Sequence, residues 1–221
     1  MSFIKELSEE FKANANPANS KPMEAYMKGH FTYYGIKTDL RRKLFKATWD
    51  RHKTEVAENP REIALELYEK TEREYHYCSI EILIKELKKK FKKEDIKLIE
   101  KLIITHSWWD SVDVIAKYLL GEYLKQYPKE ISNIIGQFSN SENMWLNRSA
   151  ILFQLGYKKD TNREILFSES LKHSESKEFF IQKAIGWALR EYGKSNPEAV
   201  KNFVATAGLK PLSTREALKN L

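Results

Sequence analysis

Trp109 and Asp113 are the residues whose types and spacing best suit chemistry. They lie four positions apart in the stretch THSWWDSVDVIAKYLLGEYL, residues 105–124, and this spacing in a helix places two side chains one turn apart on one face. A carboxylate beside an indole could stabilise a cationic transition state or orient a water molecule. A partly buried structural aspartate would show the same spacing, so the spacing by itself leaves both explanations open.

The other residues at the start of this stretch have structural explanations. Ser107 and Asp110 fit a capping box, in which a hydroxyl and a carboxylate satisfy backbone amides of the first turn. Trp108 heads an apolar stripe at helical spacing, so we expect it in the core. The stripe continues at Val112, Ile115 and Leu119. Neither the cap nor the stripe uses the candidate pair.

Trp187 is a second aromatic candidate, in the stretch KAIGWALREY. Gly186 lies beside it, and Lys183 lies one turn earlier. A single tryptophan in a helix is most often part of the core. The sequence nevertheless leaves both a buried and an exposed position open for Trp187.

The stretch MEAYMKGHFTYYGIKTDLRRKL, residues 23–44, interleaves aromatic and basic side chains. This mixture suits nucleic acid, because bases stack on aromatic rings and phosphates pair with cations. The aromatic side chains are Tyr26, Phe31, Tyr33 and Tyr34, and the basic ones are Lys37, Arg41, Arg42 and Lys43. Thr38 looks like a helix N-cap, and the basic run after it could also be a solvated helix face.

The composition favours a folded helical protein with an anionic partner. The chain of 221 residues is 42% hydrophobic and 31% charged, and 38 Lys and Arg against 31 Asp and Glu give a formal net charge of +7. Such an excess suits nucleic acid, although many basic proteins bind none.

Several classes of site and of location lack support. The chain contains no H-E-x-x-H, P-loop, G-x-G-x-x-G or G-x-S-x-G motif, so we expect no metal and no cofactor. Cys78 is the only cysteine, which excludes an intrachain disulfide. No segment has the pattern of a secretory signal or a membrane span, so we expect a cytoplasmic protein.

Helical periodicity runs through the chain, and short polar turns separate the predicted helices. Four helix starts align at intervals of 34, 36 and 35 residues, and a truncated fifth follows from Leu212. The aligned stretches are YHYCSIEIL from Tyr75, WDSVDVIAK from Trp109, WLNRSAILF from Trp145 and FIQKAIGWA from Phe180. This interval is typical of HEAT or TPR units, which bury their faces by stacking. We therefore expect an all-α solenoid that forms a single domain over residues 1–221, and a monomer.

The repeat register also predicts a basic surface. The third residue after each aligned start is Cys78, Val112, Arg148, Lys183 and Arg215. Equivalent positions of stacked repeats project from the same side, so the three basic ones could form a ladder along a concave face that meets phosphates. Ordinary solvated charges remain an alternative for Lys183 and Arg215.

Four separated blocks of the chain closely resemble the bacterial DNA alkylation repair enzymes of the AlkD type. The blocks are YMKGHFTYYGIKTDLRR, SWWDSVD, WLNRSAILFQL and KEFFIQKAIGWALREY, and the likeness runs in order from Tyr26 to Arg215. The resemblance implies a HEAT-like repeat solenoid whose basic concave face holds double-stranded DNA. It also implies a monofunctional glycosylase that excises purines alkylated at N3 or N7, such as 3-methyladenine and 7-methylguanine, without flipping the base.

The resemblance assigns roles to individual residues. It places Trp109 and Asp113 at the deoxyribose of the lesion, Trp187 as a second aromatic wall, and Arg148 at the nearby DNA backbone, where it is essential for activity. Lys37 departs from the glutamine found in at least one active relative. Together with the basic register, this gives the expected DNA contacts: Tyr26, Lys37, Thr38, Arg148, Lys183, Arg190 and Arg215.

Two alternatives belong to other functional classes. A non-catalytic helical-repeat module that binds DNA structures or protein partners would account for the charge and the repeats. A protein-binding solenoid without nucleic acid is weaker still. The non-catalytic module leaves the pairing of Trp109 with Asp113 unexplained.

Overall fold

The computed structural model describes residues 1–221 and is built from helices, as the periodicity predicted. Its only β pairing is an isolated parallel bridge between Thr32 and Glu72. The chain divides into two compact units, residues 1–90 and 91–221. The single domain expected over residues 1–221 stays a prediction.

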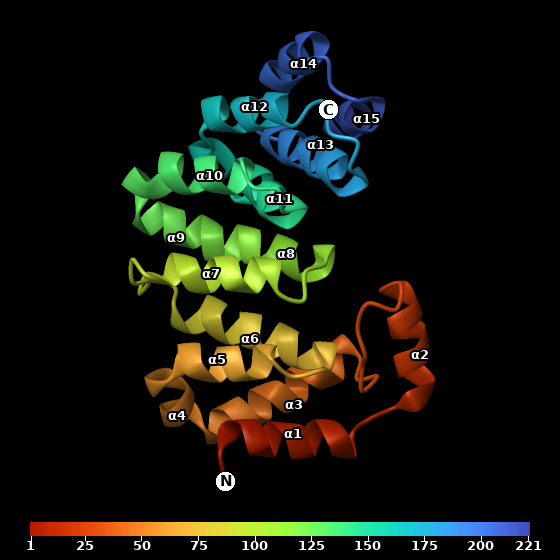
Figure 1. Ribbon diagram of the computed structural model, residues 1–221, viewed down its shortest axis with the longest axis vertical. Helices are drawn as coiled ribbons and strands as arrows, with labels where there is room; N and C mark the ends of the chain where they lie inside the picture. The colour runs from red at the N-terminus through yellow and green to blue at the C-terminus, as the bar shows by residue number, and fades with distance from the viewer. The chain divides into compact units, whose positions relative to one another are not determined.

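The first unit consists of six helices (Figure 1). They are α1 (Phe3–Ala13), α2 (Pro17–Tyr26), α3 (Thr38–Arg51), α4 (Lys53–Glu58), α5 (Pro60–Tyr68) and α6 (Arg73–Glu86). Helix α1 packs against α3, and α5 packs against α6. The helix α3 begins at Thr38 with Lys37 as its N-cap and without a side-chain cap. The N-cap expected at Thr38 is therefore wrong by one residue.

A buried carboxylate fixes the loop that leads into α3. Glu74, which is fully buried in α6, accepts backbone N–H bonds from Tyr34, Gly35 and Ile36 at 3.2, 3.0 and 3.1 Å. Gly35 has a φ of 84°, and a Cβ there would lie 2.1 Å from the backbone oxygen of Asn16. Only glycine fits such a position, so the loop has one tightly defined path.

The second unit contains nine α-helices and three short helical turns. They are α7 (Asp95–Ile104), α8 (Trp109–Ile115), the π-helix η1 (Ala116–Leu120), α9 (Gly121–Gln126), the 3₁₀ turn η2 (Pro128–Glu130), α10 (Ile131–Ser139), α11 (Met144–Leu152), the 3₁₀ turn η3 (Lys158–Asp160), α12 (Arg163–Lys172), α13 (Phe179–Gly193), α14 (Pro197–Thr206) and α15 (Pro211–Leu218). The helices form four pairs, namely α7 with α8, α10 with α11, α12 with α13 and α14 with α15. Helix α11 also packs against α8 and α13 of the neighbouring pairs. Figure 1 shows these helix pairs stacking in chain order.

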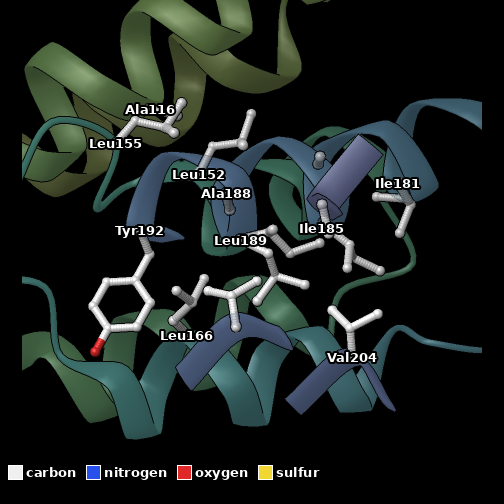
Figure 2. Close-up of a cluster of buried hydrophobic side chains, with 14 residues drawn as sticks. Ala116, Leu152, Leu155, Leu166, Ile181, Ile185, Ala188, Leu189, Tyr192 and Val204 are labelled. Atoms are coloured by element: carbon white, nitrogen blue, oxygen red, sulfur yellow. The ribbon is translucent and has the colours of Figure 1, made fainter. Parts of the chain in front are cut away.

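This stacking confirms the predicted helical-repeat solenoid fold. The aligned starts at Trp109, Trp145, Phe180 and Leu212 fall on the first or second residue of α8, α11, α13 and α15. Successive pairs bury apolar side chains between them, as in the cluster drawn in Figure 2, where Ile185 and Leu189 of α13 lie among residues of the neighbouring helices. The basic concave face stays a prediction.

The stretch after Trp109 departs from a regular α-helix. Its buried side chains come in pairs at intervals of four, at 111 and 112, 115 and 116, 119 and 120, and 123 and 124, and Gly121 is buried as well. Four residues advance an α-helix by about 400°, so this stripe would rotate by roughly 40° at each step. The wider π turn of η1 takes up part of that rotation. One apolar face thereby continues from α8 into α9.

The capping box expected at the start of this stretch is wrong. Helix α8 begins at Trp109, its N-cap is Trp108, and no side chain caps it. The Ser107 hydroxyl instead donates to the backbone oxygen of Ile103 at 2.6 Å, within the preceding helix α7.

Candidate active site

Asp113 and Arg148 form a two-point ion pair. The Nε of Arg148 donates to Oδ1 of Asp113 at 2.7 Å, and Nη2 donates to Oδ2 at 2.9 Å. Nη1 of the same guanidinium donates to the backbone oxygen of Phe180. The side chains are 13% exposed for Asp113 and 5% for Arg148. One guanidinium therefore ties together α8, α11 and α13, which belong to three successive repeats.

Burial and the ion pair act in opposite directions on the Asp113 carboxyl. Burial raises its pKa above the ordinary value of 3.8, and the hydrogen bonds and charge of Arg148 lower it, with a smaller raising effect from Asp110. Burial prevails, so the pKa of Asp113 stays raised. The guanidinium is the group that favours the charged carboxylate in this partly dry position.

This geometry gives Arg148 different partners from those expected. A residue that binds a DNA phosphate must present its donors outward, whereas the Arg148 side chain is buried and turns its donors toward Asp113 and Phe180. The side chain is buried because α11 packs against both α8 and α13. The structure therefore places Arg148 as a partner of the carboxylate.

The two adjacent tryptophans have different surroundings. Trp108, at the N-cap of α8, packs its ring against Trp145 and Phe180, with centroids 5.8 and 5.2 Å away. The rings of Trp145 and Phe180 lie 5.1 Å apart. Trp108 thus belongs to a partly buried aromatic cluster rather than to the apolar stripe. Trp109 is half-buried at the first position of α8, one turn before Asp113.

Trp187 combines the two positions that the sequence left open. It is half-buried in α13 and packs against the apolar cluster of the second unit. Part of its ring is therefore core, and part remains at the surface.

Arg148, Lys183 and Arg215 do not form the ladder of basic side chains that the register predicted. Lys183 Nζ lies 2.9 Å from Oε1 of Glu216, and Nη1 of Arg190 lies 2.9 Å from Oε2 of the same carboxylate. Their hydrogen bonds lower the pKa of Glu216 to about 2. Arg215 is exposed on α15, and Arg148 is buried. The predicted ladder is wrong because its three members differ in exposure and in pairing.

Two hydrogen-bond partners of the candidate residues could not be predicted from the sequence. Glu216 carries no distinctive spacing in the chain, since its contacts with Lys183 and Arg190 depend on how α15 packs against α13. The backbone oxygen of Phe180 has no signal in the sequence at all.

Three predicted DNA contacts lie in the first unit. Tyr26 ends α2 and is 67% exposed, and Lys37 and Thr38 are exposed at the start of α3. Tyr26 and Thr38 line one open pocket of about 330 Å³. Its other lining residues are Pro22, Met23, Met27, Tyr33, Ile36, Arg41 and Tyr77. The pocket gives the interleaved aromatic and basic pattern a common location.

The structure holds neither a cluster of metal-ligating side chains nor a membrane-spanning helix. No group of three or more His, Cys, Asp or Glu side chains could hold a metal ion. No helix is long and apolar enough to cross a membrane. Cys78 is a free thiol buried in α6, where burial raises its pKa to about 12.

Comparison with known proteins places the chain in a family. A sequence model of the family described as DNA alkylation repair enzyme matches residues 7–221. The chain belongs to the DNA alkylation repair enzyme family. It is similar to a solved structure described as "Predicted DNA alkylation repair enzyme from Enterococcus faecalis". That structure has 34% sequence identity and a TM-score of 0.83, and the alignment covers 93% of this chain and 96% of the other. No curated protein is significantly similar.

As a member of this family, the protein has a role in DNA repair, and DNA is its substrate. The matched region includes the whole second unit and hence the Asp113–Arg148 pair.

Proposed function

We propose that this DNA alkylation repair enzyme is a monofunctional DNA glycosylase that excises N3- and N7-alkylated purines, such as 3-methyladenine and 7-methylguanine, from duplex DNA. The observation that carries the proposal is the Asp113 carboxylate. Its side chain is 13% exposed, and both of its oxygens accept hydrogen bonds from Arg148. Trp109 lies one turn before it on the same helix. The protein needs neither metal nor cofactor for this reaction and acts as a monomer.

Because the alkylated purine is already a good leaving group, a carboxylate next to the sugar suffices for catalysis. Alkylation at N3 or N7 puts a positive charge on the purine, so the base leaves as a neutral molecule when it takes the electron pair of the N-glycosidic bond. Positive charge then develops on the deoxyribose. A carboxylate next to the sugar stabilises that charge, and it orients the water that attacks C1′ and accepts its proton.

The Arg148 pair prepares Asp113 for this role. An ionised carboxylate offers about four lone-pair positions, and the two bonds from Arg148 occupy only two of them. The open edge can therefore face the sugar and the water. The guanidinium fixes the orientation of the carboxylate and opposes its protonation, so Arg148 acts as a positioning residue.

The indoles complete the proposed site. Trp109 and Trp187 would lie against the sugar edge, where the faces of aromatic rings attract developing positive charge. Both rings are half-buried, and we expect them to form a shallow wall, which suits attack without base flipping. Tyr26, Lys37, Thr38, Lys183, Arg190 and Arg215 are proposed to contact DNA, with the cations among them directed to phosphates.

An oligonucleotide duplex with one 7-methylguanine tests the reaction. Wild-type protein should release the free base and leave an abasic site without cutting the strand, and Asp113→Asn should lower the single-turnover rate by about 100-fold or more. A wild type that binds the duplex with steep salt dependence but releases no base would instead support the non-catalytic DNA-binding module. Undiminished release by Asp113→Asn would remove the carboxylate from the mechanism.

A further inference from the structure

Glu216 of α15 packs over Gly186 of α13, where a larger side chain than glycine has no room. A Cβ at Gly186 would lie 2.4 Å from the Cβ of Glu216 and 2.9 Å from the backbone oxygen of Ser213. The missing side chain at Gly186 therefore lets α15 approach the surface of α13 closely. Lys183 and Arg190 lie three positions before and four positions after Gly186, so their side chains flank the same spot.

The Glu216 carboxylate binds both flanking cations at once. Oε1 lies 2.9 Å from Lys183 Nζ, Oε2 lies 2.9 Å from Arg190 Nη1, and the same Nη1 donates to the backbone oxygen of Glu216 at 2.9 Å. The side chains are 14% exposed for Glu216, 37% for Lys183 and 25% for Arg190. Two cations with access to solvent thus share one shielded anion.

Trp187 lies between the two cations on the same side of the helix. It follows Lys183 by four positions and precedes Arg190 by three. A phosphate that approaches Lys183 or Arg190 near this indole meets cations that already hold a carboxylate. The two oxygens of Glu216 take the places that two phosphate oxygens would take.

We propose that Glu216 is a specificity-determining residue that competes with DNA phosphate for Lys183 and Arg190. This inference rests on the proposed function, since it needs DNA on this face. The carboxylate reduces a local charge of +2 to +1, and so weakens the attraction for any DNA backbone. Undamaged duplex DNA binds mainly through its phosphate backbone, so Glu216 weakens the binding of undamaged DNA most. Discrimination between damaged and undamaged DNA improves.

A purely structural role for the carboxylate does not account for its partners. Ion pairs with such access to solvent add little to stability. Helix α15 also has buried attachments to α13, because the Ser213 hydroxyl donates to the backbone oxygen of Gln182 at 3.0 Å and Ala217 is fully buried. The close approach at Gly186 does not depend on the charge of Glu216.

The test compares Glu216→Gln with wild type in binding undamaged duplex across a range of salt concentrations. The variant should bind several-fold more tightly at low salt, and the slope of log K against log salt should steepen by about 1, because each neutralised phosphate contributes about 0.9. The ratio of affinities for 7-methylguanine duplex and undamaged duplex should fall. Equal or weaker binding by Glu216→Gln would overturn the proposal.

Two further variants separate this effect from total charge and from misfolding. Glu198→Gln makes the same change in net charge at an exposed pair with Lys201 on α14, and it should leave the slope nearly unchanged. Lys183→Gln should weaken binding more in the Glu216→Gln background than in wild type. Additive effects in that cycle, or an equal slope change in Glu198→Gln, would refute competition. Unchanged thermal unfolding of the variants would confirm that they are folded.

The same experiment distinguishes the two proposals. A wild type that neither binds duplex DNA nor releases 7-methylguanine contradicts the proposed function. A wild type that does both, with Glu216→Gln behaving like Glu198→Gln, contradicts only the role of Glu216.

Discussion

The guanidinium of Arg148 holds both carboxylate oxygens of Asp113, at 2.7 and 2.9 Å, from the neighbouring repeat. Both side chains are largely shielded from water, so their attraction is stronger than that of a surface pair. Arg148 is also bonded to the backbone of the next repeat at Phe180. The orientation of the proposed catalytic carboxylate therefore depends on the packing of three successive repeats.

The pH profile of base release should report this pair. Burial raises the pKa of Asp113, and the hydrogen bonds and charge of Arg148 oppose that rise. Activity that needs the carboxylate should fall as pH drops through this raised pKa. In Arg148→Gln the opposing influence is lost, so the acid limb should move to higher pH, and the maximal rate should fall by about 10-fold or more. Single-turnover rates between pH 4 and 8 would measure both.

Arg148→Lys is the matched comparison for that profile. It keeps the positive charge but not the two-point geometry, so its acid limb should stay closer to wild type while its rate remains low. If Arg148 acted instead as a phosphate contact, both variants would weaken DNA binding and reduce its salt dependence. That outcome, with an unmoved acid limb, would contradict the positioning role.

The pair should also couple the stabilities of α8 and α11. Removing one partner leaves the other as an uncompensated buried charge, so Asp113→Asn or Arg148→Met alone should lower the free energy of unfolding by about 3 kcal/mol. The double variant should lose less than the sum of the two. Urea unfolding of all four proteins would give the coupling energy. Additive losses would show that the ion pair contributes nothing to stability.

The repeat register was predictable because stacking imposes a regular interval. The aligned starts fell on the correct helices, and the Trp109 and Asp113 pair stands one turn apart in α8. These properties depend on spacing within one helix or on the interval between repeats. The sequence carries both directly.

Contacts between repeats could not be predicted in the same way. Arg148 and Lys183 share a register position, yet one is buried against Asp113 and the other meets Glu216 at the surface. The difference arises from the depth at which each helix packs, which the interval does not determine. The π turn at 116–120 likewise reflects a four-residue spacing of buried pairs that becomes evident only with the burial pattern.

Trp187 should separate stability from activity through the size of the substitution. Because its ring packs against the apolar cluster, Trp187→Ala should lower the free energy of unfolding by about 3 kcal/mol. Trp187→Phe should preserve most of that packing but reduce the aromatic surface offered to the sugar, so base release should slow by several-fold with a small loss of stability. Equal rates for Trp187→Phe and wild type in single-turnover assays would leave the indole only a core role.

Glu74 should control the loop that carries Lys37 and Thr38. Its two carboxylate oxygens accept three backbone N–H bonds from Tyr34, Gly35 and Ile36. Glu74→Gln replaces one oxygen with an amide NH₂, which leaves at least one buried N–H without an acceptor at a cost of about 1–3 kcal/mol.

Hydrogen exchange would locate the effect of that substitution. The amides of Tyr34, Gly35 and Ile36 should exchange faster in Glu74→Gln, and DNA affinity should fall because Lys37 and Thr38 lose their fixed positions. Glu62→Gln, on the neighbouring helix α5, is a matched control for the loss of one carboxylate. A loop that stays equally protected in Glu74→Gln would mean that Gly35 and the packing around it suffice to hold the path into α3.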